Sequence, residues 1–234
     1  MQNYYEKNKS IYANYLKKLD TYLAGVTYSI YLRGSANKLV NQFHYKPWDI
    51  DMVLFCHEVI DCYIIEKIKE VTFKFNNEIT PMGYPYVDFR FLYNPENNSS
   101  DSYLLYLLKE DSYLIKGNGC EFINNAKKPS EKELIDLYNK NIEIAINKYQ
   151  NIIYQSDNND KYDHKIKNII KSISRCGCIL LLLKDDVFTR DVNSGLKKLQ
   201  QYFMDDAFLN IQLPISKFDC IHDIHLALLK IAKI

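Results

Sequence analysis

Residues 30–55 read IYLRGSANKLVNQFHYKPWDIDMVLF. The apolar runs at the two ends of this segment predict two buried strands. The first run leads into Gly34 and Ser35. A glycine lets the backbone approach a phosphate closely, and the serine hydroxyl and the amides that follow can donate hydrogen bonds to it. The turn between the two strands is therefore a candidate phosphate-binding element.

The second predicted strand begins with two acidic residues, Asp49 and Asp51. Because successive side chains of a strand point to opposite faces, both carboxylates should lie on one face, while Ile50 and Met52 point into a core. Mg²⁺ is usually held by one or two protein carboxylates together with substrate phosphates. The pair therefore predicts a magnesium site that serves a nucleoside triphosphate.

A third acidic residue, Asp88, lies in a further predicted strand, residues 86–92, where Val87 and Phe89 alternate with it. It would complete the set of catalytic and metal-binding carboxylates that the first two acids begin. The alternative is that all three acids are solvated residues at exposed strand positions. Both segments are otherwise so apolar that the functional interpretation is favoured.

The composition limits the classes of partner. The 234 residues are enough for one sizeable core or two small ones, and 30 Lys and Arg face 29 Asp and Glu. This balance does not indicate a surface that grips nucleic acid without sequence preference. No apolar run reaches the roughly 18 residues that span a bilayer, and the first residues lack the apolar core of a signal peptide. We therefore expect a cytoplasmic protein with neither a membrane nor a nucleic-acid partner.

The cysteines and two of the histidines are side chains of a type that can bind metal ions. The six cysteines lack the paired spacing of a metal site and mostly lie in apolar stretches, so they are predicted to be reduced core thiols. His222 and His225 would share one side of a helix. With no partner segment for a metal site, a solvated helix face is the favoured interpretation of the two histidines.

The pattern of apolar residues changes to a purely helical one at about residue 127. Residues 1–127 are therefore predicted to form an α/β domain that carries the acids, and residues 128–234 an all-helical domain. Thr189 and Ser216 are the expected N-caps of the last two helices. The helices are predicted over residues 4–23, 36–43, 59–75, 131–153, 161–183, 190–202 and 217–234.

A Gly-Ser turn, an Asp-x-Asp sequence on the next strand and a third acid on another strand together resemble the nucleotidyltransferase superfamily, the group related to polymerase β. The second half of the chain is similar to the helical domain of aminoglycoside 3''/9-adenylyltransferases, the spectinomycin and streptomycin resistance enzymes. That similarity rests on a strand and glycine turn at 111–117 before the acidic start of a helix at 131–134, on Ser174-Arg175, and on Thr189-Arg190-Asp191-Val192.

The resemblance implies an α+β nucleotidyltransferase domain with a mixed sheet, followed by a helical bundle. It implies transfer of AMP from ATP to a hydroxyl of a small-molecule acceptor, with Mg²⁺ held by Asp49, Asp51 and Asp88 in a two-metal mechanism. Asp88 would be either a base or only a metal ligand. The resemblance also assigns Arg175 and Arg190 to the β- and γ-phosphates, a role that suits the planar guanidinium. Two ordinary surface arginines are the alternative.

Several features depart from the pattern of the resistance enzymes. Trp48 replaces a serine before the first metal-binding Asp, the spacing from Gly-Ser to Asp-x-Asp is a few residues longer, and Asp88 stands where Glu is usual. The segment 89–117 is shorter than its counterpart, so the acceptor is expected to differ from spectinomycin and streptomycin. The remaining alternatives are a protein or RNA acceptor, as in nucleotidyltransferases of toxin systems, or a degenerate nucleotide-binding module.

Overall fold

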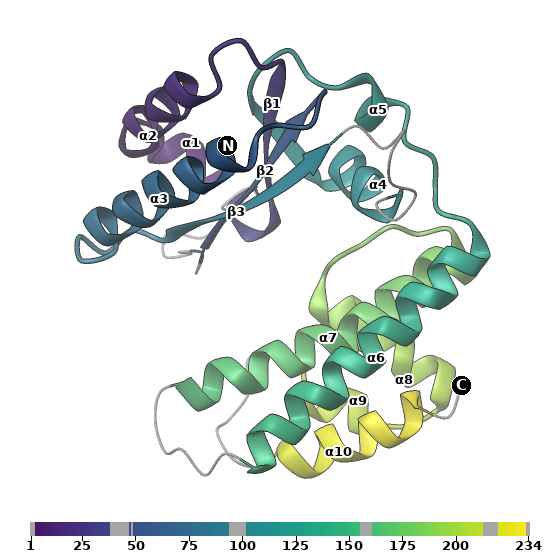
Figure 1. Ribbon diagram of the computed structural model, residues 1–234. Helices are drawn as coiled ribbons and strands as arrows, with labels where there is room; N and C mark the ends of the chain where they lie inside the picture. The colour runs from purple at the N-terminus through teal and green to yellow at the C-terminus, as the bar shows by residue number, and fades with distance from the viewer. Residues whose placement is uncertain are drawn as a thin grey trace. The chain divides into compact units, whose positions relative to one another are not determined.

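The computed structural model describes residues 3–37, 47, 49–93, 102–154, 161–212 and 220–232. The chain divides into two compact units, Met1–Lys128 and Pro129–Ile234. The first unit holds a four-stranded mixed sheet with helices on both faces, and the described part of the second consists of helices and their connections (Figure 1). The predicted fold class, an α+β unit followed by a helical bundle, is confirmed.

The sheet has the strand order β3-β2-β1-β4. β1 runs antiparallel to both of its neighbours, whereas β2 and β3 are parallel and are joined by the crossover helix α3 (Cys62–Ile79). The carboxyl end of β1 and the amino ends of β2 and β3 therefore meet at one end of the sheet. The strands are β1 (Tyr28–Arg33), β2 (Asp49–Cys56), β3 (Tyr86–Tyr93) and β4 (Ser112–Lys116).

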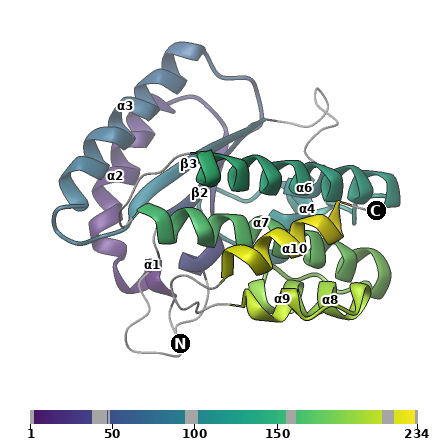
Figure 2. The ribbon, with the colours of Figure 1, turned by 90° about the horizontal axis from the view of Figure 1, so that it is seen from below.

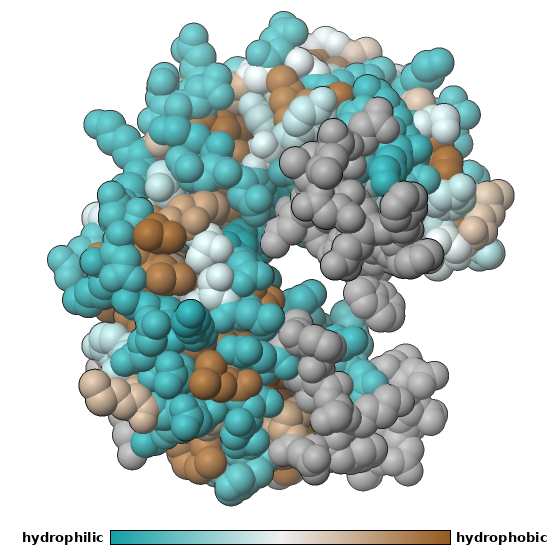
Figure 3. All heavy atoms as spheres, turned by 180° about the vertical axis from the view of Figure 1, so that it is seen from behind, coloured by the Kyte–Doolittle hydropathy of each residue, from teal (hydrophilic) through white to brown (hydrophobic). Residues whose placement is uncertain are grey.

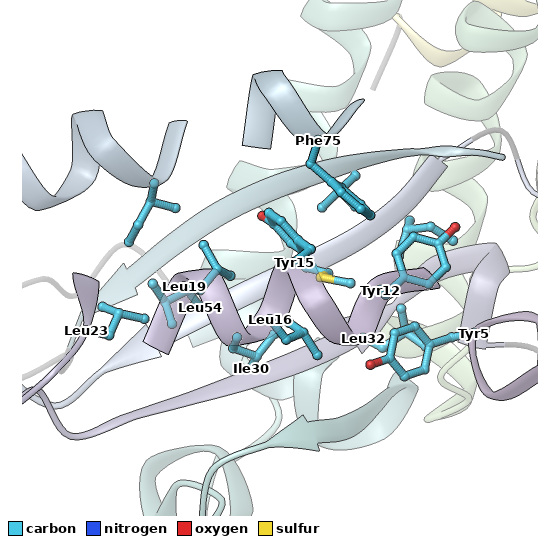
Figure 4. Packing of buried hydrophobic residues seen from close by; sticks show 14 of the residues in the cluster. Tyr5, Tyr12, Tyr15, Leu16, Leu19, Leu23, Ile30, Leu32, Leu54 and Phe75 are labelled. Atoms are coloured by element: carbon cyan, nitrogen blue, oxygen red, sulfur yellow. The ribbon is translucent and has the colours of Figure 1, made fainter. Parts of the chain in front are cut away.

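One face of the sheet is covered by α2 (Lys9–Tyr22) and α3, which lie side by side (Figures 1 and 2). In the core below them, Tyr15 stacks on Phe75 with ring centroids 4.6 Å apart, and its hydroxyl shares a 2.7 Å hydrogen bond with Thr72. Ile50 and Met52 are buried in this core, as the strand alternation predicted. Figure 4 shows further members of the cluster, among them Tyr5, Tyr12, Leu16, Leu19, Leu23, Ile30, Leu32 and Leu54.

Local hydrogen bonds shift the helix boundaries of the first unit. The helix predicted over residues 4–23 is divided into α1 (Tyr4–Lys7) and α2, because Asn8 Nδ2 donates to Tyr4 O at 2.9 Å and ends the first turn. The helix predicted over residues 59–75 begins later, after Asp61, whose carboxylate accepts from Tyr63 N at 2.6 Å.

The other face of the sheet carries two helices that were not predicted, α4 (Ser102–Asp111) and α5 (Glu121–Asn124). α4 lies against β1 and β4 and buries four leucines, Leu104, Leu105, Leu107 and Leu108. The predicted helix at 36–43 falls largely outside the described residues, which show only a 3₁₀ turn, η1 (Gly34–Asn37).

The two long helices of the second unit match their predictions to within two residues. They are followed by shorter helices, of which α8 packs on α7, and α10 packs on both α6 and α7. The helices are α6 (Glu131–Tyr154), α7 (Lys161–Asp185), α8 (Val192–Phe203), α9 (Ala207–Asn210) and α10 (Cys220–Ile231).

The start of α8 differs from its prediction. Asp191, not Thr189, is the N-cap, and its carboxylate accepts a hydrogen bond from Ser194 N at 2.7 Å. Thr189 Oγ1 instead accepts from Asp191 N at 3.1 Å, so it shapes the turn before the helix. Arg190 therefore lies in this turn and not in the helix. Ser216, the predicted cap of the last helix, lies outside the described residues.

α7 and α8 cross with their backbones in contact at two glycines. A Cβ added at Gly177 would overlap the backbone of Gly195, and one at Gly195 would overlap the backbone of Ser174. Ser174 Oγ also donates to Val192 O at 2.8 Å, which adds a hydrogen bond between α7 and the first turn of α8. The crossing therefore depends on the absence of both side chains.

We expect Gly177→Ala to lower the free energy of unfolding by about 1–3 kcal/mol, because overpacking outweighs the roughly 1 kcal/mol that alanine gains in helix propensity. Urea unfolding followed by circular dichroism measures this change. Lys197→Ala, at an exposed position of α8, is the control and should change stability little. A Gly177→Ala protein as stable as the wild type would contradict the close crossing.

Most of the cysteines lie in the core, whereas the two histidines of α10 lie at the surface. All six cysteines are free thiols and five are buried, whereas Cys62 is exposed. His222 and His225 are both exposed, and the ring of His225 stacks on Tyr149 at 5.7 Å. Neither histidine belongs to a cluster of metal-type ligands among the described residues.

Hydrophilic and apolar side chains are mixed on the face of the molecule drawn in Figure 3. The face drawn in Figure 3 is largely hydrophilic, with apolar side chains in small separate groups. Within the described ranges, no helix combines the length and the apolar character needed to cross a bilayer.

Candidate active site

The three predicted acids meet at one end of the sheet. Asp49 and Asp51 extend from the start of β2, and Asp88 extends from the start of β3, where the parallel register pairs it with Asp51. One carboxylate oxygen from each lies within 4.8 Å of those of the other two. Asp49 and Asp51 are half-buried, whereas Asp88 is exposed. The strand geometry therefore brings together the three residues that the sequence singled out.

This donor set fits Mg²⁺. The ion takes oxygen ligands at about 2.0–2.1 Å in octahedral geometry, so two ligands of one ion lie about 3–4 Å apart. Carboxylate oxygens within 4.8 Å of one another can share one ion or bridge a pair. The exposed side of the cluster, at Asp88, leaves room for ligands from a substrate.

Gly34 places the turn after β1 directly against the acids. Its φ of +73° lies in the left-handed region that glycine favours, and a Cβ there would collide with the carboxylate of Asp51. The backbone of Ser35 continues into η1. The predicted phosphate-binding turn and the predicted metal ligands are therefore neighbours.

Arg33 lies beside the acids as well, although it was not predicted as a site residue. It is the last residue of β1 and pairs with Asp51 in the antiparallel register. Its Nη2 lies 3.6 Å from Asp51 Oδ1. A basic residue at the end of an otherwise apolar strand, just before the Gly-Ser turn, was the signal in the sequence.

Tyr86 also lies beside the acids, two residues before Asp88 and on the same side of β3. It pairs with Asp49 in the parallel register. Burial raises the pKa of the Tyr86 phenol, and the negative charges of Asp49, Asp88 and Asp51 raise it further. The phenol therefore stays protonated and can donate a hydrogen bond at this site.

Within the helical unit, Arg175 and Arg190 are sequence neighbours of Ser174 and Asp191, which take part in the contacts between α7 and the start of α8. Arg175 is exposed on α7, and Arg190 is half-buried in the turn before α8. Burial raises the pKa of the Cys178 thiol to about 11, and the positive charges of Arg190 and Arg175 oppose that rise. Arg190 Nη1 is buried and has no hydrogen-bond partner among the described atoms.

Lys148 of α6 adds a cation to this group and was not predicted. Its ammonium donates to Ser172 Oγ on α7 at 3.0 Å. Burial lowers the pKa of Lys148, and the positive charges of Arg175 and Lys171 lower it further. Like charges gathered at a half-buried position are unfavourable unless an anion offsets them. Only the packing of α6 on α7 reveals this cluster.

Neither a protein-family model nor a curated protein matches the chain. Among solved structures, the chain is similar to spectinomycin adenyltransferase from Enterococcus faecialis, in a crystal structure with ATP and spectinomycin. The TM-score is 0.56 at 14% sequence identity, and the match covers 94% of this chain and 98% of that one. The chain therefore shares the overall fold of that adenyltransferase, as the resemblance in sequence implied.

Proposed function

We propose that the chain is a Mg²⁺-dependent nucleotidyltransferase that moves AMP from ATP to a hydroxyl of a small-molecule acceptor. The supporting observation is the cluster of Asp49, Asp51 and Asp88 beside the Gly34 turn. The likeness in fold to an adenyltransferase that was crystallised with ATP and a small molecule is consistent with it. In this proposal the first unit is the catalytic domain.

The three acids would hold Mg²⁺, and Gly34 and Ser35 would bind the triphosphate with backbone amides and a hydroxyl. When bound, Mg²⁺ offsets the charge of the triphosphate and lowers the pKa of the acceptor hydroxyl. The acceptor oxygen forms a bond to the α-phosphorus, the bond from this phosphorus to the α–β bridging oxygen breaks, and pyrophosphate leaves. Asp88, the most exposed acid, is the proposed acceptor of the hydroxyl proton.

Arg175 and Arg190 are proposed to bind the β- and γ-phosphates of ATP, the role that the resemblance in sequence implied. The planar guanidinium groups of Arg175 and Arg190 can each donate paired hydrogen bonds to phosphate oxygens. Two observations support this role: the buried Nη1 of Arg190, which lacks a hydrogen-bond partner among the described atoms, and the repulsion between the charges of Lys148 and Arg175. An anion at this cluster would offset the repulsion among its cations.

Transfer with differently labelled ATP tests the proposed reaction. The protein is incubated with Mg²⁺, a pool of small hydroxyl compounds, and ATP labelled on either the α- or the γ-phosphorus. Label from the α-phosphorus alone should appear on a small molecule. Label from the γ-phosphorus would indicate phosphoryl transfer instead, and label on protein or RNA would identify a macromolecular acceptor. No transfer with either nucleotide would refute the proposal.

Spectinomycin and streptomycin belong in the same assay as defined acceptors. Because the segment 89–117 is shorter than its counterpart in the resistance enzymes, we expect both drugs to be poor acceptors. The expected kcat/KM lies below roughly 10⁴ M⁻¹s⁻¹, the low end for working enzymes. A higher value for either drug would make that drug the natural type of acceptor.

Arg175→Gln and Arg190→Gln should each lower kcat/KM for ATP about 10- to 100-fold, because a hydrogen bond to a charged group contributes about 1.5–3 kcal/mol. Steady-state kinetics with varied ATP measure the effect. Lys197→Gln removes one positive charge from an exposed position of α8 and is the matched control. If the control loses as much as the two arginine variants, the effect is one of net charge and the phosphate assignment is wrong.

A further inference from the structure

The ion pair between Arg33 and Asp51 is unusual for its position. Both side chains are largely buried, with 16% and 22% of their areas exposed, and Asp51 is one of the three proposed metal ligands. Arg33 therefore holds a fixed positive charge at the edge of the metal site, 3.6 Å from a ligand oxygen. Because the pair is sheltered from solvent, salt screens its charge less than it screens that of a surface pair.

The arginine acts on the empty site in two ways. Three carboxylates with oxygens within 4.8 Å repel one another, and the guanidinium offsets part of this repulsion. A divalent ion that binds Asp51 must instead approach the guanidinium, and this repulsion opposes binding. Arg33 thus stabilises the site without metal and weakens its attraction for metal.

We propose that Arg33 is a built-in counter-cation that lowers the affinity of the empty triad for divalent ions. A triphosphate brings several negative charges, which offset the guanidinium and restore the attraction for metal. The metal then binds together with the nucleotide more readily than alone. This inference rests on the proposed function, because it takes the triad to be a metal site.

The test is a Mn²⁺ titration of the full chain without nucleotide, with free Mn²⁺ measured by electron paramagnetic resonance. Arg33→Gln removes the charge and should tighten Mn²⁺ binding roughly tenfold or more. Arg33→Lys keeps a positive charge and should stay close to the wild type. Lys17→Gln, at an exposed position of α2 on the opposite face of the sheet, removes one positive charge away from the acids and should change little.

Three results would overturn the proposal: unchanged or weaker Mn²⁺ binding by Arg33→Gln, an equal gain in Lys17→Gln, or no binding of Mn²⁺ by any variant. Circular dichroism and thermal unfolding check that each variant is folded. If Arg33→Gln does not fold, Arg33→Met replaces it, because methionine keeps an unbranched apolar chain in place of the arginine stem.

The same titration separates this inference from the proposed function. Suppose that Arg33→Gln binds Mn²⁺ more tightly but the wild type transfers no AMP under any condition. This result would refute the proposed transfer reaction and leave the proposed role of Arg33 standing. If the wild type transfers AMP but has the same Mn²⁺ affinity as Arg33→Gln, only the proposed role of Arg33 is refuted.

Discussion

Asp49→Asn is expected to lower the rate of AMP transfer about a hundred- to a thousandfold while the protein stays folded. The amide keeps the shape of the side chain but removes one negative charge from a cluster of three that lies within 4.8 Å. In the proposed mechanism this charge stabilises the transition state, and the loss of such preorganised groups lowers rates by about 10²–10³ or more. Initial rates at saturating ATP and Mg²⁺ measure the effect.

Glu78→Gln provides the matched control for this variant. It makes the same chemical change at an exposed position of α3, away from the cluster. Its transfer rate should equal that of the wild type. Asp49→Asn should also be at least as stable as the wild type, because the substitution relieves repulsion between neighbouring carboxylates. An Asp49→Asn protein that keeps near wild-type activity would remove Asp49 from the proposed set of metal ligands.

Gly34→Ala should have the second large effect, a loss of at least about a hundredfold in kcat/KM. The new methyl group would collide with the carboxylate of Asp51, so either the turn or the metal ligand must move. A displacement of about 1 Å in a catalytic group can lower the rate about a hundredfold. The variant should also bind Mn²⁺ more weakly, because Asp51 is a proposed ligand.

Gly25→Ala isolates the cause of this loss. Gly25 has a φ of +83°, close to the +73° of Gly34, but among the described residues no atom beyond its chain neighbours lies within 4 Å of the place that its Cβ would take. Both substitutions therefore introduce backbone strain of about 1–2 kcal/mol, and only the one at Gly34 meets the carboxylate. Both variants should lose similar stability in thermal unfolding, whereas activity should fall only in Gly34→Ala. Equal losses of activity would show that strain, and not the contact with Asp51, is responsible.

The sheet and its acids could be predicted because local pattern determines them. The alternation around Asp49 and Asp51 fixes which residues face the core, and apolar runs mark the strands. Likewise, α6 and α7 are long and periodic, so their ends were predicted to within two residues. In each of these cases the information lies within a few residues of the feature.

The features that were missed depend on contacts between distant segments or on close competition between neighbours. The pairing of Arg33 with Asp51 requires the antiparallel register of β1 and β2. The charge cluster at Lys148 requires the packing of α6 on α7. At the start of α8, Thr189 and Asp191 are both good caps, and only the observed bond to Ser194 distinguishes them.

The backbone contact between α7 and α8 at Gly177 and Gly195 determines how the helical unit presents its charges. Helices that touch through backbone atoms cannot slide past each other by a change of rotamer. Arg175 on α7 and Arg190 just before α8 are therefore anchored in one rigid body, and the spacing between their backbones is set before any ligand arrives. In the proposed function, a polyphosphate would bind two cations whose backbones are already fixed. Little of its binding energy would then be spent on ordering those backbones.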